Sequence, residues 1–284
     1  MAAARCARAV IEYDGTAFAG SQRQPGHRTV QGELEEALNR LTGDRITVRL
    51  AGRTDAGVHA TGQVAAFCLP ATGRRPRYGW PELRRRLNAI LPPDLSVRSL
   101  AAVPEGFDPR RDAAERVYRY RIRTGGEKRP LDRHRTLEIA ERLDVDAMRA
   151  AARMAVGQRD FGALGSDPSG RGYTVRRVSA IEVRSRGRLV EVRVVADAFL
   201  RRMVRSLVAL LMAVGRGELT PAAAAELLGH SERALAGRAA PARGLTLERV
   251  RYAGASVSRM IDNQTKTTET TTTTGDTGSG EQPR

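Results

Sequence analysis

Apolar residues recur along this chain at two spacings, which predict a mixture of helices and strands. Residues 29–41 repeat apolar side chains every three or four positions, as an amphipathic helix does, with Thr29 as the N-cap and Gly43 as the stop. Residues 199–214 carry the strongest helical pattern, and residues 116–123 alternate strictly, as a half-buried strand does. The same criteria predict further strands at residues 9–13, 46–50, 63–67, 95–103, 190–196 and 245–252, and further helices at residues 81–91, 144–156 and 221–228.

The order of these elements indicates two similar halves followed by a tail. Strands and helices mix before a seam near residues 107–112 and again after it, although no sequence repeat is visible. We therefore expect an α+β fold with an N-terminal half at residues 1–108 and a C-terminal half at residues 109–255. Residues 256–284 are polar, rich in threonine and nearly without apolar side chains, which predicts a disordered tail.

The charge of the chain points to a class of partner. Its 284 residues include 48 Lys and Arg against 32 Asp and Glu, a net charge of +16. The predicted tail itself sums to −1, so the rest of the chain carries +17. This excess fits either a solvated arginine-rich surface or a polyanionic partner. We favour the polyanion, because arginine binds phosphates through two parallel hydrogen bonds.

Composition argues against several other classes. The four histidines and two cysteines are scattered, without the close pairs that zinc sites use, so no metal is expected. The chain has no Walker loop, so no nucleotide cofactor is indicated. No apolar run is long enough to span a bilayer, so no membrane is expected. Cys6 and Cys68 do not make a disulfide framework, which favours a reducing cytoplasm.

The segment GRTDAG, residues 52–57, holds the main candidate for chemistry. Asp55 lies between Gly52 and Gly57, with Arg53 two positions before it. It fits a turn residue that hydrogen-bonds its own backbone, which is the commoner role of an aspartate in such a loop. It also fits a single carboxylate that stays charged beside cations and acts as base or nucleophile, in a loop whose glycines let a ligand approach.

Two arginine-bearing segments are compatible with an RNA surface. In RVYRYRIR, residues 116–123, one face carries Tyr118, Tyr120 and Ile122, and the other face carries Arg119, Arg121 and Arg123. That pattern fits either base stacking or buried tyrosines backed by solvated arginines. Arg201, Arg202 and Arg205 oppose the apolar stripe of the strongest predicted helix, with Arg201 one turn from Arg205. They fit a solvated face or a site that grips phosphate or carboxylate.

Taken together, these motifs resemble the TruA-type tRNA pseudouridine synthases. Matching stretches run in the family's order over nearly the whole chain before the tail. GRTDAGVHA alone is highly specific, and MVR and PARGL lie downstream of it. The longest matching stretches are TVQGELEEAL, GRTDAGVHATGQVAAF, LNAILPPDLSVRS, DAFLRRMVRSLV and APARGLTLERVRY.

The resemblance implies a fold, a reaction and a partner. The implied fold is two ferredoxin-like α+β halves joined in a central antiparallel sheet, with the active-site cleft between them. The implied partners are tRNA and a second copy of the chain, with one tRNA held across a homodimer in the cytoplasm. The implied reaction is isomerisation of uridine to pseudouridine at positions 38, 39 and 40 of the anticodon stem-loop, without a metal or organic cofactor.

Roles transfer from the family motifs to five residues of this chain. Asp55 matches the catalytic aspartate, and Arg205 matches the arginine that pairs with it. Tyr118 matches the tyrosine that packs on the target base and takes a proton. Arg53 matches the arginine that holds the target nucleotide out of the stack, and Leu245 matches an apolar wall of the pocket. Asp55 has three open routes: attack on the ribose carbon, attack on the base, or removal of a ribose proton.

The chain also departs from the family's pattern, and two rival functions remain. Ser21, Arg159 and Asp197 stand where the family often has Trp, His and Asn, which puts tRNA affinity and the modified positions in doubt. One rival is a non-catalytic tRNA-binding chaperone of the same fold, which would not need Asp55. The other is a metal-dependent RNA-processing hydrolase, which would need a cluster of acids or histidines.

Overall fold

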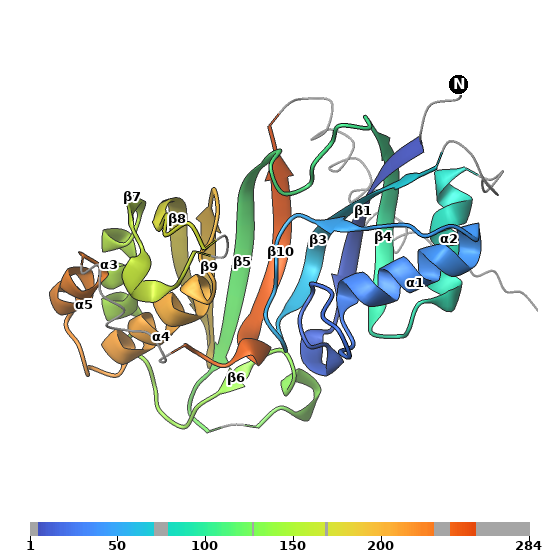
Figure 1. Ribbon diagram of the computed structural model, residues 1–284. Coiled ribbons are helices and arrows are strands. Elements are labelled where there is room, and N and C mark those ends of the chain that lie inside the picture. The colour runs from blue at the N-terminus through green and yellow to red at the C-terminus, as the bar shows by residue number, and fades with distance from the viewer. Residues whose placement is uncertain (1–4, 71–78, 127, 168–169, 230–238, 254–284) are drawn as a thin grey trace, which may run out of the picture.

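The computed structural model describes residues 5–70, 79–126, 128–167, 170–229 and 239–253. Within these ranges the chain forms one mixed sheet with helices packed beside it, which confirms the α+β class (Figure 1). The predicted tail at residues 256–284 lies outside the described residues. No helix in the described ranges combines the length and the apolar character that crossing a bilayer requires.

The sheet runs in the order β4-β1-β3-β10-β5-β9-β8-β7, with β2 paired to β3 and β6 paired to β5. The pairs β10–β3 and β5–β6 are parallel and the others are antiparallel, so the sheet is not the purely antiparallel one that the resemblance implied. The strands are β1 (Arg5–Tyr13), β2 (Arg49–Leu50), β3 (His59–Leu69), β4 (Leu95–Val103), β5 (Ala113–Arg123), β6 (Leu137–Glu138), β7 (Gly157–Asp160), β8 (Val175–Arg186), β9 (Leu189–Ala196) and β10 (Leu245–Tyr252).

The last strand, β10, lies in the middle of the sheet. It pairs in parallel with β3 through Thr246 and Leu247, and it pairs antiparallel with β5. Strands from the first part of the chain lie on one side of it, and β5, β9, β8 and β7 lie on the other (Figure 1). The loop before β3, the middle of β5 and the start of β10 therefore meet at the centre of the molecule.

The helices flank the two ends of this sheet (Figure 1). The α-helices of the described residues are α1 (Val30–Thr42), α2 (Trp80–Ile90), α3 (Val145–Met154), α4 (Met203–Gly215) and α5 (Pro221–Gly229). Short 3-10 helices lie at Gly15–Ala17, Pro130–Asp132, Gly162–Leu164 and Ala242–Gly244. Both predicted ends of α1 are confirmed, because the Thr29 side chain accepts a hydrogen bond from the Gly32 N–H and Gly43 has a left-handed φ of 75°.

Two predicted elements have other bounds in the structure, and two strands were missed. Helix α4 begins at Met203 instead of residue 199, because Arg202 takes a left-handed φ of 67° and interrupts the helical backbone. The predicted strand at residues 46–50 shrinks to β2, although Ile46 and Val48 are buried as their alternation indicated. Strands β7 and β8 were not predicted, and a register shift in β8 breaks the alternation that would have revealed it.

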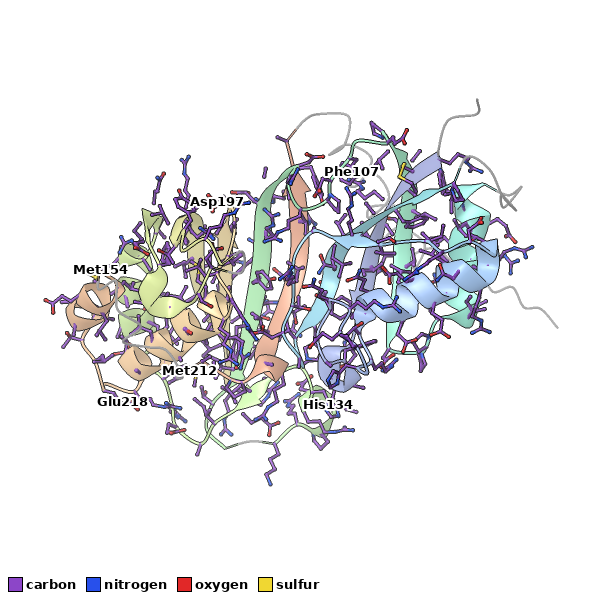
Figure 2. All side chains as sticks on the ribbon, viewed as in Figure 1. Phe107, His134, Met154, Asp197, Met212 and Glu218 are labelled. Carbon is purple, nitrogen blue, oxygen red and sulfur yellow. A yellow bond between two sulfur atoms is a disulfide. The ribbon has the colours of Figure 1, made fainter. Side chains whose placement is uncertain are left out.

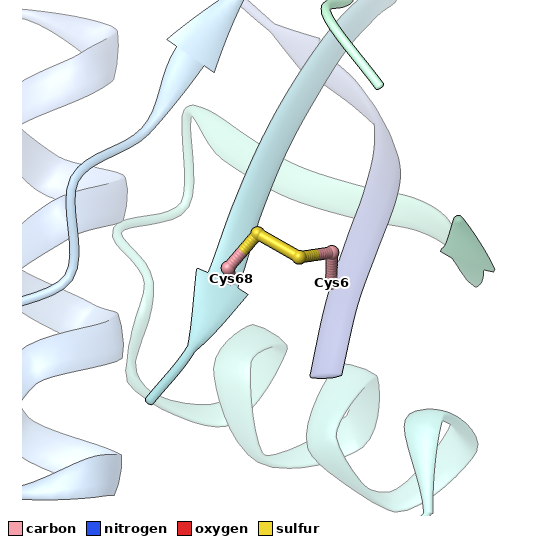
Figure 3. The surroundings of a disulfide bond; sticks show 2 residues. All are labelled: Cys6 and Cys68. Atoms are coloured by element: carbon pink, nitrogen blue, oxygen red, sulfur yellow. A yellow bond between two sulfur atoms is a disulfide. The ribbon is translucent and has the colours of Figure 1, made fainter. Parts of the chain in front are cut away.

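Cys6 and Cys68 form a disulfide between β1 and β3, a bond that the sequence analysis did not expect (Figure 3). The two residues lie directly opposite each other in the antiparallel pairing of these strands. The register of the β1–β3 pairing brings the two residues together although 62 positions separate them in sequence. The presence of two cysteines does not by itself show which residues of the two strands pair. Cysteine usage therefore no longer supports the prediction of a reducing cytoplasm.

Candidate active site

Asp55 lies in the loop between β2 and β3, at the first position of a tight turn. Its carbonyl oxygen accepts a hydrogen bond from the N–H of Val58 at 3.1 Å. Gly57, at the third position, has a φ of 77°, which glycine adopts without the strain that a side chain would bring. The turn leads directly into β3, so the central sheet fixes one end of the loop.

The Asp55 carboxylate pairs with Arg205, which is 150 positions away in sequence. Arg205 Nη1 donates a hydrogen bond to Asp55 Oδ2 at 3.1 Å. Arg205 lies in the first turn of α4, and its Nε donates to the carbonyl oxygen of Ala240 at 2.7 Å. Among the described residues the other carboxylate oxygen, Oδ1, has no hydrogen-bond partner. The side chain therefore contacts a cation instead of its own backbone, which favours the functional interpretation of Asp55.

Three buried side chains contact the loop just before Asp55. Ser21 Oγ accepts a hydrogen bond from the N–H of Thr54 at 2.8 Å, and the Ser21 N–H donates to Thr54 O at 3.1 Å. Gln63 bonds both backbone groups of Gly52, donating to its oxygen at 2.8 Å and accepting from its N–H at 3.3 Å. The Tyr13 hydroxyl lies 2.9 Å from Thr54 Oγ1. The carboxylate thus follows a backbone that the core of the N-terminal strands keeps in place.

Tyr118 lies in the middle of β5, close to the same loop. It is 7% exposed, and its ring makes an edge-on contact with Phe199 at a centroid distance of 5.1 Å. Its hydroxyl would lie 3.9 Å from a Cβ built on Gly52. Burial raises the pKa of Tyr118 above its usual value, and the neighbouring Asp55 carboxylate raises it further. The hydroxyl is therefore protonated at neutral pH, which suits donation of a hydrogen bond better than removal of a proton.

Arg116 is a buried cation that the sequence analysis did not single out. It is 8% exposed, and burial lowers its pKa from the usual value. Its guanidinium donates hydrogen bonds at 2.5–3.2 Å to four backbone carbonyls, those of Ala51, Arg110, Ala113 and Asp197. The signal was present in the alternation of β5, because position 116 falls on the apolar face that carries Tyr118.

A cavity of about 1600 Å³ surrounds the Asp55–Arg205 pair. It exceeds the range of roughly 300–1,000 Å³ that is usual for small-molecule sites. Asp197, which Figure 2 labels beyond the end of β9, belongs to its wall. The charged residues that line it are Arg53, Arg110, Arg116, Arg171, Arg176, Arg177, Arg201, Arg202, Arg205, Asp55, Asp167 and Asp197. Nine arginines against three aspartates favour a ligand that carries phosphates.

The remaining predicted residues also line this cavity. Leu245, the first residue of β10, is 5% exposed and supplies an apolar patch. Arg53 is exposed and makes no ion pair within the described ranges, so its guanidinium is available to a ligand. Arg201 and Arg202 are exposed and precede α4. The backbone of Arg201 forms an isolated antiparallel β-bridge with that of Ser166. The predicted helical turn between Arg201 and Arg205 is therefore wrong.

His59 links three distant segments behind the loop. Its Nδ1 accepts a hydrogen bond from the N–H of Gly15 at 3.0 Å. Its Nε2 therefore carries the proton and donates to the carbonyl oxygens of His134 at 2.6 Å and Arg243 at 3.2 Å. His134 is labelled at the lower edge of the sheet in Figure 2. Burial lowers the pKa of His59, so the neutral ring performs this structural role. No group of three or more potential metal ligands occurs among the described residues.

The family model for tRNA pseudouridine synthase matches residues 9–110 and 151–253. The chain belongs to the tRNA pseudouridine synthase family. The tRNA pseudouridine synthase A of Geobacter sulfurreducens is 41% identical over 87% of this chain and 100% of its own length. The enzyme of the same name from Chloroflexus aurantiacus is 44% identical over 86% of this chain and 87% of its own length. The one from Thermotoga petrophila is 41% identical over 86% of this chain and 98% of its own length. The family consists of isomerases, so the chain is an enzyme of that class.

Proposed function

We propose that this protein converts uridine to pseudouridine in tRNA, at positions 38, 39 and 40 of the anticodon stem-loop. Family membership supports tRNA as the substrate. The Asp55–Arg205 pair inside an arginine-lined cavity is the observation that assigns the proposed reaction to a site. The reaction breaks the bond from uracil N1 to ribose C1′, turns the base, and forms a bond from uracil C5 to C1′, while C5 loses a proton and N1 gains one. Substrate and product have the same atoms, so the chemistry requires one carboxylate and no phosphate donor.

Each of five residues around the cavity has its own role in the proposed reaction. Asp55 acts as nucleophile or base through the carboxylate oxygen that Arg205 does not contact, while Arg205 orients the other oxygen. The Tyr118 ring packs on the target base and its protonated hydroxyl donates a hydrogen bond. Leu245 forms the apolar wall, and Arg53 contacts a phosphate of the flipped nucleotide. Flipping costs a few kcal/mol of unstacking, which cationic and stacking contacts offset.

The proposal also includes the division of the chain into two halves and its assembly into a homodimer. Two ferredoxin-like halves, at residues 1–108 and 109–255, fit the gathering of β1 to β4 on one side of β10 and of β5 to β9 on the other. A homodimer that holds one tRNA across both subunits remains a prediction from the resemblance. A tRNA substrate also fits the predicted cytoplasmic location.

The test is the Asp55→Asn variant, assayed for pseudouridine in anticodon stem-loop RNAs that carry a single uridine at position 38, 39 or 40. The change keeps the size of the side chain and removes its charge, so turnover should fall by roughly 10³-fold or more while RNA binding persists. Asp146→Asn is the matched control, because that side chain is 89% exposed and lies outside the cavity. Full activity of Asp55→Asn would refute the catalytic role. Binding without any pseudouridine, even in the wild type, would favour the chaperone.

A further inference from the structure

Tyr173 presents an exposed aromatic ring at the cavity wall. Its exposed fraction is 63%. The other large hydrophobic side chains that are exposed in the described residues are Leu131, Met154 and Val156, and none of them lines the cavity. A tyrosine ring exposed to water in a cavity lined by nine arginines is available to contact a ligand.

The backbone that carries Tyr173 is fixed. Arg176 Nη1 donates hydrogen bonds to the carbonyl oxygens of Tyr173 at 3.0 Å and Val175 at 2.6 Å. The next residue, Thr174, accepts a hydrogen bond from the N–H of Phe161 at 3.2 Å, directly after β7. Strand β8 begins at Val175. The backbone at Tyr173 is therefore held in place before any ligand arrives, which lowers the entropy cost of binding.

The chemistry around the ring selects a flat ligand attached to phosphates. The buried Arg176 guanidinium carbon lies 5.5 Å from the centroid of the Tyr173 ring, a cation–π contact that occupies one side of the ring. The high exposure leaves the other side accessible. Arg171 and Arg177 line the same cavity and are exposed. The phosphate backbone of a ligand whose flat group contacts the Tyr173 ring therefore meets positive charge.

We propose that Tyr173 is a stacking site for an unpaired nucleobase that neighbours the target uridine, with Arg171 and Arg177 contacting its phosphates. This inference rests on the proposed function. Removing one base from a stem leaves its neighbours with an open face, and an aromatic side chain can cover that face. The volume of about 1600 Å³ gives room for more than the one nucleotide held near Asp55.

The first experiment compares Tyr173→Ala with Tyr173→Phe. The alanine variant should bind an anticodon stem-loop RNA about tenfold more weakly, with turnover at saturating RNA unchanged. The phenylalanine variant keeps the ring and should stay within about twofold of wild type. Leu131→Ala is the control, because Leu131 is 97% exposed and lies outside the cavity, and its affinity should not change. Wild-type affinity in Tyr173→Ala would overturn the proposal.

The second experiment identifies the base. Abasic residues are introduced one at a time into the same RNA, and binding is measured with wild type and Tyr173→Ala. At one position the abasic change should weaken binding to wild type about tenfold and have no further effect on the variant. Additive losses at every position would overturn the proposal. Pseudouridine formation by wild type on the unmodified RNA reports on the function separately, so failure of the stacking site and failure of the function are distinguishable.

Discussion

Ser21 and Thr54 exchange two hydrogen bonds, one through the serine hydroxyl and one through its backbone N–H. Thr54 directly precedes Asp55, and Ser21 is fully buried. From the family resemblance we expected tryptophan at this position, so Ser21 is a departure from the expected pattern. The departure therefore falls on a residue that holds the loop carrying Asp55, and the small hydroxyl supplies an acceptor that an indole ring lacks.

The Ser21→Ala variant tests this contact. It leaves the buried N–H of Thr54 without its acceptor, which costs about 1–3 kcal/mol and loosens the loop that carries Asp55. We expect turnover to fall about tenfold while the Michaelis constant for tRNA stays unchanged, since the arginines of the cavity remain. Ser179→Ala is the control, because that hydroxyl bonds Glu115 outside the cavity. Lower thermal stability with unchanged turnover would show that Ser21 serves the fold alone.

The Tyr118→Phe variant separates the ring from the hydroxyl. The ring keeps its edge-on contact with Phe199 and the proposed place beside the target base. The hydroxyl, which burial keeps protonated, is lost. We expect single-turnover rates to fall more than tRNA affinity. Tyr252→Phe, which removes a hydroxyl that donates to Pro109 O elsewhere in the core, controls for loss of a buried hydrogen bond. Equal losses in rate and affinity would contradict the division of roles.

The Gly15→Ala variant tests how tightly the loop is packed. A Cβ at position 15 would lie 2.1 Å from the carbonyl oxygen of Val58, and that atom belongs to the backbone of the loop. The clash should lower stability by about 1–3 kcal/mol and reduce turnover, because the loop shifts away from Arg205. A Cβ at Gly106 meets nothing within 4 Å, so Gly106→Ala is the control. Unfolding temperature and turnover measure both effects, and a variant like wild type in both would contradict the packing argument.

His59 makes stability depend on pH. Burial lowers its pKa below the usual 6.5, while Asp14, 3.2 Å from Nδ1, opposes the shift and Arg135 adds to it. The unfolded chain therefore binds the proton more readily than the folded chain does. The stability contributed by neutral His59 is present above pH 6.5 and is lost as the pH falls through the folded pKa.

The measurement is the unfolding temperature of wild type and His59→Gln at about pH 7.5 and about pH 5. The variant lacks the titrating ring, so wild type should lose more stability than the variant between these two values. His27→Gln is the control, since His27 is exposed at the surface. Parallel curves for wild type and His59→Gln would mean that protonation of this ring does not govern acid stability.

Much of the fold follows from patterns that span only a few residues. The helix at Val30–Thr42 and the strand at Leu95–Val103 were predicted closely, because burial of one face imposes its period on the sequence and caps mark the ends. The alternation in β5 puts Arg116 on the buried face of Tyr118, a position that the sequence prediction did not use. It did not show that Arg116 would be satisfied by four carbonyls, since those carbonyls belong to separate segments.

The sequence alone determined the class of the fold, the positive charge of the chain and the motifs that identify the family. The tertiary structure decided the contacts that turn those motifs into a site. The family resemblance already implied that Asp55 pairs with Arg205 across 150 positions, and the structure shows their hydrogen bond. The contact between Ser21 and Thr54 across 33 positions appears only in the folded chain. Strand register joins Cys6 to Cys68, and a fixed loop before β8 presents Tyr173 to the cavity. Such pairs depend on how the whole chain packs, which no local spacing encodes.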